Sequence, residues 1–524
     1  MQVRCVHCQT LIDVATDDLP QSPVCPACAA DQSREPAECD VLPGWAIAEL
    51  SDLLHGPLPT AATSSSHPRV QHDVNESKRG VPSPSLRSQP KSAAAWNSLG
   101  FTLASQGEYE QAIRHFDEAI RRNPNYAVAH NNRGFAYAAR KKYELAIADF
   151  DTAIRIDPEL AGAHNNRGLA HAARKEYGLA IADSSRAIEI DPTLALAFQN
   201  RGLAYAAQGQ YDPALSDFNE AIRLNPKLAN AFHNRGFCFT ALGDFERAVH
   251  DYDEEIRVKP QSAFGFYNRA FVNVWKGEYK PAIQDFCEAI RLKPNLADAH
   301  FGRGDVYRAQ GDYEQSIRDY TSTIRHNPRF ALAYYHRGEV FSIRQEFSRA
   351  IADFTELILL NSSLPGAYHS RGLAYAATNQ HELAIRDFDQ TICLAPQSAG
   401  AFNNRALSHA ARSDYERAIV DHLEAIRLNP KVASAFEDFA RIWIASPFAD
   451  VRSGQLAIAL ATRACELSDW EDWKSLTALA AAHAEIGEFD DAVKWTEQSL
   501  ALAPEDEQEN CRDRLATYDA RRHY

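Results

Sequence analysis

The chain has 524 residues, a formal net charge of −15 and ten cysteines. The negative charge argues against a protein that binds nucleic acid by neutralising phosphates. Ten cysteines are too few for a disulfide scaffold of this length. No apolar run reaches the roughly 20 residues that span a bilayer, and the N-terminus lacks the apolar core of a signal peptide. We therefore expect a cytoplasmic protein without a membrane span.

The first 30 residues contain two closely spaced cysteine pairs. Cys5 and Cys8 form one CxxC motif, and Cys25 and Cys28 form another after sixteen intervening residues. Two such pairs can supply four thiolates to one tetrahedral zinc ion. The residues between them have the β-branched and turn character of a short hairpin. The pattern resembles a zinc ribbon, which implies one structural zinc ion. The alternative, two redox motifs, lacks a surrounding βαβ pattern.

A polar segment follows the cysteine pairs. We assign residues 1–40 to the zinc-ribbon-like segment and residues 41–92 to a flexible linker. Residues 57–92 are rich in Pro, Ser and Thr, and such a composition cannot bury enough apolar surface to fold. The preceding WAIAELSDLL stretch is amphipathic and could form one short helix.

Proline then recurs with a fixed period of 34 residues. The prolines that keep this period are Pro124, Pro158, Pro192, Pro226, Pro260, Pro294, Pro328, Pro396 and Pro430. Ser362 holds the one slot in this series that lacks a proline. A fixed period of this length predicts an array of stacked repeats, not one large core.

Each repeat shows the same alternation of large and small residues. Counted from Ala93 as position 1, the first has Trp96 at position 4, Gly100 at position 8 and Ala112 at position 20. The next nine repeats also carry small residues at positions 8 and 20. This pattern resembles the tetratricopeptide repeat (TPR), a helix–turn–helix unit of 34 residues. The resemblance implies an all-α fold, a right-handed α-solenoid (superhelix) of about twelve repeats.

The regularity of the pattern divides the array. Residues 93–432 make up ten regular repeats. Residues 433–506 hold the last two repeats. The eleventh is irregular, because the alanines expected at positions 20 and 27 are Ala457 and Ala464, five residues further along the chain, and the twelfth is regular again. We expect the polar residues 507–524 to form a C-terminal capping helix, because a terminal repeat needs a polar outer face.

Two charged positions recur together in repeats two to ten. Position 7 is always arginine: Arg133, Arg167, Arg201, Arg235, Arg269, Arg303, Arg337, Arg371 and Arg405. Position 23 is always aspartate: Asp149, Asp183, Asp217, Asp251, Asp285, Asp319, Asp353, Asp387 and Asp421. Two antiparallel helices joined near position 15 bring these positions to the same height. We predict a ladder of Arg–Asp pairs, each contributing about 0–1 kcal/mol if it lies at the surface.

Position 6 carries a row of asparagines, namely Asn132, Asn166, Asn200, Asn234, Asn268 and Asn404. Asparagine is a mediocre helix former, so helix propensity does not explain the row. Its amide offers a donor and an acceptor that match a peptide unit. The row resembles the asparagine ladder of other TPR superhelices, which implies binding of a peptide backbone in the concave groove. The alternative is an asparagine that bonds its neighbouring helix.

The asparagine row is interrupted at Gly302, His336 and Ser370, where the same stripe becomes acidic. The acidic residues are Asp298 at position 2 and Asp305 and Glu339 at position 9. One interpretation is a subsite for a basic or aromatic ligand side chain. The alternative is drift within a long array.

No catalytic constellation is present, since the sequence lacks HExxH, P-loop and nucleophile-elbow motifs. We therefore expect a non-enzymatic scaffold that binds an extended peptide or partner protein in its groove. The alternative is a regulatory or targeting subunit of an enzyme complex, with the zinc ribbon contacting nucleic acid or the partner enzyme. The array itself is not expected to bind nucleic acid. The sequence fixes neither the partner nor the oligomeric state.

Overall fold

The computed structural model describes residues 2–4, 11–13, 92–445 and 454–521. Cys5, Cys8, Cys25 and Cys28 lie outside the described residues, as does nearly all of the linker. The described part separates into two compact blocks, Met1–Glu278 and Tyr279–Tyr524. None of the described helices combines the length and the apolar character that a membrane span requires.

Two short strands lie at the N-terminus. Strand β1 (Gln2–Arg4) pairs antiparallel with β2 (Leu11–Asp13), with Val3 opposite Ile12. Most of the residues between the two cysteine pairs, where a hairpin is expected, lie outside the described residues.

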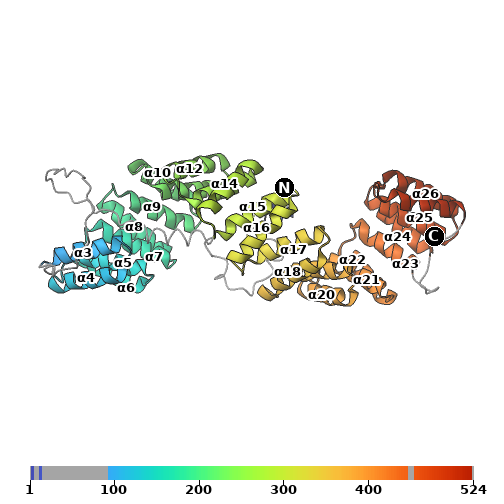
Figure 1. The fold of residues 1–524 in the computed structure, drawn as a ribbon, viewed down its shortest axis with the longest axis horizontal. Helices are drawn as coiled ribbons and strands as arrows, with labels where there is room; N and C mark the ends of the chain where they lie inside the picture. The colour runs from blue at the N-terminus through green and yellow to red at the C-terminus, as the bar shows by residue number, and fades with distance from the viewer. Residues whose placement is uncertain (1, 5–10, 14–91, 446–453, 522–524) are drawn as a thin grey trace, which may run out of the picture. The chain divides into compact units, whose positions relative to one another are not determined.

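The remaining described elements are helices, which alternate between a first and a second helix of each repeat (Figure 1). Those of the N-terminal block are α3 (Ala93–Ser105), α4 (Tyr109–Arg122), α5 (Ala127–Ala139), α6 (Tyr143–Ile156), α7 (Ala161–Ala173), α8 (Tyr177–Ile190), α9 (Ala195–Ala207), α10 (Tyr211–Leu224), α11 (Ala229–Ala241), α12 (Phe245–Val258) and α13 (Ala263–Trp275).

The C-terminal block continues the same alternation. Its helices are α14 (Tyr279–Leu292), α15 (Ala297–Ala309), α16 (Tyr313–His326), α17 (Ala331–Ile343), α18 (Phe347–Leu360), α19 (Pro365–Ala377), α20 (His381–Leu394), α21 (Ala399–Ala411), α22 (Tyr415–Leu428), α23 (Ala433–Ala445), α24 (Gly454–Leu467), α25 (Trp473–Glu485), α26 (Phe489–Leu502) and α27 (Gln508–Asp519). The final helix, α27, packs on α26 and buries Cys511 and Tyr518.

A tight turn at position 15 separates the two helices of a repeat. The turn residue has a positive φ, as at Gly107 (80°) and Gly209 (74°). Glycine adopts this left-handed conformation without a steric penalty, and it commonly ends helices for that reason. Some repeats place another residue there, as at Lys141 (58°) and Asn379 (59°).

Small residues at position 8 let the second helix of the repeat pack directly on the first. A Cβ atom on Gly134 would lie 2.7 Å from the ring of Phe150 at position 24. Phe150 is fully buried, so its ring has no room to move away. The same contact recurs between Gly372 and Phe388. The expected role of position 8 is thereby confirmed.

Candidate peptide-binding face

In eight repeats, the position-7 arginine pairs with the position-23 aspartate of its own repeat. In the eight repeats with both residues in one block, Nε and Nη2 donate two parallel hydrogen bonds of 2.6–2.9 Å to the carboxylate. This bidentate arrangement confirms the predicted Arg–Asp ladder.

The same arginines also reach back to the preceding repeat, which the sequence pattern did not reveal. The third nitrogen, Nη1, donates to the side chain at position 25 of that repeat, sixteen residues earlier. Arg133 contacts Asp117 at 2.6 Å, and Arg337 contacts Thr321 at 2.8 Å. Position 25 varies between Asp, Ser, Asn, Cys and Thr. These side chains share the ability to accept a hydrogen bond, and a comparison of residue identities does not show this.

The ladder is partly buried, since its aspartates are buried while the paired arginine side chains are 15–23% exposed. The position-23 aspartates are 1–7% exposed, for example Asp251 at 1%. Burial raises the pKa of Asp319, but the hydrogen bonds from Arg303, together with the His300 ring 3.6 Å away, outweigh this effect and hold the pKa below its usual value. The Asp319 carboxylate in turn raises the pKa of Arg303. Breaking such a buried pair leaves an uncompensated charge.

The position-6 asparagines form hydrogen bonds between neighbouring first helices. Asn132, Asn166 and Asn200 each donate from Nδ2 to the asparagine at position 5 of the preceding repeat, at 2.9–3.0 Å. Asn268 and Asn404 contact a histidine at that position, with both distances 3.3 Å. These bonds match the alternative given for the row, in which the asparagine bonds its neighbouring helix. Only the remaining donor and acceptor capacity of each amide is open to a ligand.

The row breaks where position 5 or 6 changes. Gln199 replaces asparagine at position 5, and the Nδ2 atom of Asn234, the residue that would donate to it, is buried without a hydrogen-bond partner. Gly302 replaces asparagine at position 6, and a Cβ atom there would lie 2.6 Å from the ring of Phe286. The glycine at position 302 therefore leaves room for this ring.

Two of the three predicted acidic residues belong to one cluster. Asp305 accepts a hydrogen bond from the Tyr320 hydroxyl at 2.6 Å. Arg308 lies between the two carboxylates, 3.7 Å from Asp305 and 3.6 Å from Glu339. His336 Nδ1 lies 3.5 Å from Glu339. These carboxylates therefore already have cationic or hydroxyl partners within the protein.

Asp298 is separate from that cluster. It is exposed at the start of α15, and no ion pair joins it to Asp305 or Glu339 within residues 279–445. The structure therefore brings together two of the three residues predicted as an acidic subsite.

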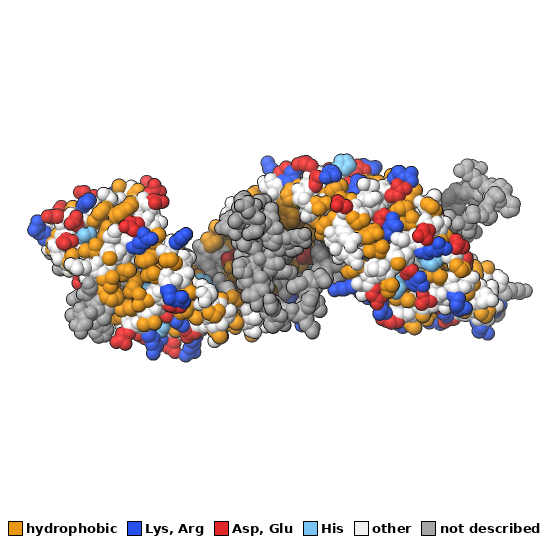
Figure 2. All heavy atoms as spheres, turned by 180° about the vertical axis from the view of Figure 1, so that it is seen from behind, with side chains coloured by type: hydrophobic (Ala, Val, Ile, Leu, Met, Phe, Trp, Pro, Cys, Tyr) orange, Lys and Arg blue, Asp and Glu red, His pale blue; other side chains and the backbone are white. Residues whose placement is uncertain are grey.

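Apolar side chains reach the surface along the first helices, and Figure 2 shows such side chains in patches between charged ones. At position 9, Phe271 is 38% and Leu373 43% exposed; at position 13, Trp275 is 53% and Ile343 56% exposed. Core packing does not require these exposed surfaces. Exposed aromatic and aliphatic side chains on one face are typical of protein interaction sites.

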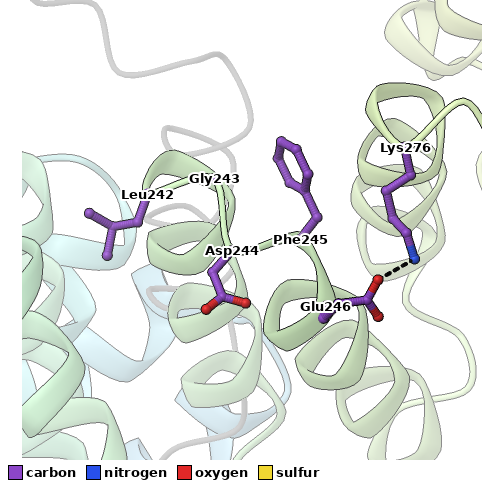
Figure 3. A pocket seen from close by; sticks show the side chains of 6 residues that line it. All are labelled: Leu242, Gly243, Asp244, Phe245, Glu246 and Lys276. Atoms are coloured by element: carbon purple, nitrogen blue, oxygen red, sulfur yellow. Dashed lines mark ion pairs between the residues drawn. The ribbon is translucent and has the colours of Figure 1, made fainter.

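A hollow of about 460 Å³ lies beside Trp275, at the turn between α11 and α12. Leu242, Phe245 and Lys276 line it, and Lys276 pairs with Glu246 at 2.9 Å (Figure 3). The rings of Phe245 and Trp275 meet edge to face with centroids 5.5 Å apart. The hollow therefore extends the apolar surface of α13 past the end of that helix.

One group of side chains in the described part has the composition of a metal site. His483, Glu488 and Asp491 place their ligand atoms within 4.8 Å of one another. His483 and Glu488 stand at positions 11 and 16 of their repeat and contact each other at 2.7 Å. His171 and Glu176 occupy the same two positions in another repeat and contact each other at 2.6 Å. The recurrence indicates a brace across the turn, so we assign no metal to this group.

These features define a class of protein: an array of 34-residue helical hairpins with an apolar and amide-bearing face on its first helices. Models of the tetratricopeptide repeat match residues 93–126, 127–160, 195–228, 369–433 and 475–509, and a TPR repeat model matches residues 274–308 and 304–342. The chain belongs to the tetratricopeptide repeat family.

Solved structures of several repeat proteins are similar to this chain. Yeast Tom70 is 15% identical, with 82% of this chain and 96% of that chain covered and a TM-score of 0.35. The APC/C hetero-tetramer Cut9–Hcn1 is 14% identical, with 82% of this chain and 96% of that chain covered and a TM-score of 0.42. YrrB, described as a TPR protein with an unusual peptide-binding site, is 23% identical. The match covers 35% of this chain and 95% of that chain, with a TM-score of 0.30. A search of curated proteins found no match.

Proposed function

We propose that this protein is a non-enzymatic scaffold that binds an extended peptide or a partner protein along the first-helix face of its repeats. The observation that carries the proposal is the row of exposed apolar side chains at positions 9 and 13, which includes Phe271, Trp275, Ile343 and Leu373. Within each block, exposed apolar side chains on the first helices are a favourable surface for a partner.

The position-6 asparagines add hydrogen-bonding groups to the face that carries the exposed apolar side chains. Asn132, Asn166 and Asn200 are held in place by their bonds to the preceding helix. A side chain that is already ordered loses less entropy when it binds a ligand. Asn132 and Asn166 stay partly exposed, so their remaining donor and acceptor capacity suits a peptide backbone without selecting its sequence, whereas Asn200 is buried.

The proposal is tested by substituting exposed positions, which leaves the fold intact. Phe271, Trp275, Leu373 and Leu407 would be changed together to serine in the full chain, and captured proteins compared with the wild type by quantitative mass spectrometry. We expect partners to be lost. Changing Asn132, Asn166, Asn200 and Asn234 to alanine is a less specific test, because it also removes bonds between repeats.

A matched control uses the opposite face. Leu179, Leu359 and Leu423 lie on second helices and are 54%, 74% and 55% exposed. Their change to serine removes similar apolar area and should leave the partners in place. If both variants keep the same partners, the first-helix face is not the binding surface. The alternative of a regulatory or targeting subunit, with contacts made by residues 1–40, would then be favoured.

A further inference from the structure

A strip of aromatic side chains lies on one face of α13, the last helix of the N-terminal block. Tyr267, Phe271 and Trp275 follow one another at a spacing of four residues, which places them on the same face of the helix. The ring centroids of Tyr267 and Phe271 are 6.3 Å apart, and those of Phe271 and Trp275 are 5.0 Å apart. Phe245 of α12 extends the strip, since its ring centroid lies 5.5 Å from that of Trp275. We call these four residues the aromatic strip.

Two residues at this place depart from the repeat pattern. Of the ten regular repeats, eight have alanine or serine at position 13, and the exceptions are Trp275 and Ile343. Leu242 is the one apolar residue at position 14 of these repeats. Trp275 is 53% and Leu242 51% exposed, so packing within the array does not account for either departure. Large apolar side chains at exposed positions point to a partner.

The hollow beside the aromatic strip gives a ligand side chain a place to enter. It has a volume of about 460 Å³ and lies between the turn that carries Leu242 and the end of α13 that carries Lys276 (Figure 3). Phe245 lines it from the start of α12. A side chain that packs on the strip can therefore extend into the hollow.

The charges around the hollow are negative in sum. Lys276 pairs with both Glu246 and Glu278, at 2.9 and 3.0 Å, and these two carboxylate side chains remain 82% and 46% exposed. Asp244, which also lines the hollow, pairs with Arg247 at 2.6 Å. One lysine thus serves two carboxylates, and the rim keeps a net negative charge. A partner of complementary charge is basic.

The aromatic strip favours a proline-rich partner segment over a helical one. The indole N–H of Trp275 forms no hydrogen bond within residues 92–278. A polyproline II segment has no internal hydrogen bonds, so its backbone carbonyls can accept from such a donor. The carbonyls of a helical ligand are already bonded. Proline-rich segments dock on surfaces lined by aromatic rings, and their stiffness reduces the entropy lost on binding.

We propose that the aromatic strip and its hollow bind a basic, proline-rich segment of a partner protein. Proline rings of the segment pack on Phe271 and Trp275, and the Trp275 indole donates a hydrogen bond to a backbone carbonyl of the segment. An arginine or lysine of the segment pairs with Glu246 and Glu278. The inference rests on the proposed function, because it names the chemistry of a partner for one part of the first-helix face.

The test measures peptide binding to the full chain by fluorescence anisotropy. The probe is a dye-labelled, C-terminally amidated peptide of eight prolines followed by two arginines. One companion peptide replaces the prolines by alanines, and another replaces the arginines by glutamines. We expect the probe to bind about ten-fold more tightly than either companion. Equal binding of the alanine peptide would overturn the recognition of proline, and failure of all three peptides to bind would overturn the site.

Substitutions on the aromatic strip locate the site. Trp275→Ser should weaken binding of the probe by about ten-fold or more. Trp275→Phe keeps an aromatic ring but lacks the N–H donor, so it should weaken binding about five-fold. Ile343→Ser is the matched control, because Ile343 occupies position 13 of another repeat and is 56% exposed, and it should bind like the wild type. Unchanged binding by Trp275→Ser would overturn the inference.

The carboxylates give an independent readout. The double variant Glu246→Gln with Glu278→Gln should remove the preference for the arginine probe over the glutamine peptide. In the wild type this preference should shrink between about 50 mM and 500 mM salt, because salt screens exposed charges. The matched control is Glu144→Gln with Glu176→Gln, since these carboxylates pair with Arg174 in the same way. A preference that both double variants keep would exclude the role of the carboxylates.

The variant Leu373→Ser with Leu407→Ser separates this inference from the proposed function. It removes exposed apolar side chains of the C-terminal block, so it should lose captured partners while keeping the proline probe. If the serine variant at Phe271, Trp275, Leu373 and Leu407 loses partners but the wild type does not bind the probe, this inference is wrong and the proposed function stands.

Discussion

Arg201 donates two parallel hydrogen bonds to Asp217, from Nε at 2.8 Å and from Nη2 at 2.7 Å, and donates a third to Ser185 of the preceding repeat at 3.1 Å. One side chain thus joins the two helices of its own repeat and links that repeat to its neighbour. Since Asp217 is 4% exposed, this is a buried charge pair.

Arg201→Met should destabilise the array by about 3–5 kcal/mol, because it leaves the Asp217 carboxylate buried and unpaired. The measurement is native-state hydrogen exchange of α9 and α10, since repeat arrays do not unfold as one unit. Arg223→Met is the control. It removes an exposed pair with Glu220 on the same repeat and should cost less than 1 kcal/mol. Equal costs would show that burial of the pair is irrelevant.

The double variant Arg201→Met with Asp217→Leu should recover most of the lost stability, because it removes both charges and fills the space with apolar atoms. Hydrogen exchange of the same two helices is the readout. A double variant as unstable as Arg201→Met would mean that the ladder contributes net stability and not only repeat register.

Gly134→Ala should destabilise its repeat by about 1–3 kcal/mol, because the added methyl overlaps the buried ring of Phe150. Gly162→Ala is the matched control. A Cβ atom there meets nothing within 4 Å, so this change should stabilise α7 by up to about 1 kcal/mol. Thermal unfolding followed by circular dichroism measures both. A destabilising Gly162→Ala would contradict the steric explanation.

His422 occupies the position-24 slot that holds phenylalanine in most repeats, and both its ring nitrogens are buried without a hydrogen-bond partner. Burial lowers its pKa to about 4. A group with a depressed folded-state pKa binds its proton more readily in the unfolded chain. Its stabilising effect is therefore present above pH 6.5 and is lost as the pH falls from about 6.5 to about 4.

The double variant His422→Phe with Ala406→Gly recreates the Gly372–Phe388 combination of another repeat. It should be more stable than the wild type by about 1–3 kcal/mol at pH 7, because no buried polar atom lacks a partner. Its advantage should grow between pH 6.5 and pH 4. Melting temperatures across this range are the measurement, and a constant difference would refute the role of His422 protonation.

The zinc-ribbon-like segment remains a prediction from its cysteine spacing. Elemental analysis of the full chain should find one zinc ion per molecule, and Cys25→Ser with Cys28→Ser should abolish it. Removal of zinc with a chelator should leave the helical circular dichroism signal and its melting temperature unchanged, because each repeat packs on its neighbours alone. A metal-free wild type would exclude the site.

The sequence predicted those features that repeat with unchanged residue identity. The spacing located the helical hairpins, and the pairing of Arg201 with Asp217 followed from the fixed positions 7 and 23. It did not reveal the bonds to position 25, because Asp117, Ser185 and Thr321 share only the ability to accept a hydrogen bond.

The candidate site was less accessible to sequence reasoning. Asparagine at position 6 is compatible with a ligand or with a neighbouring helix, and only coordinates show that Asn166 bonds Asn131. Burial and long-range juxtaposition decide such features, and a local pattern contains neither.

The backward reach of the position-7 arginines has a consequence for how such a chain can change in length. Each of repeats two to nine brings one arginine for its predecessor and one acceptor for its successor. Duplication or loss of a whole 34-residue segment therefore restores every bond at the junction, whatever acceptor stands at position 25. An insertion of another length would displace Arg201, Asp217 and Ser185 from one another. The array is thus free to gain or lose whole repeats during evolution.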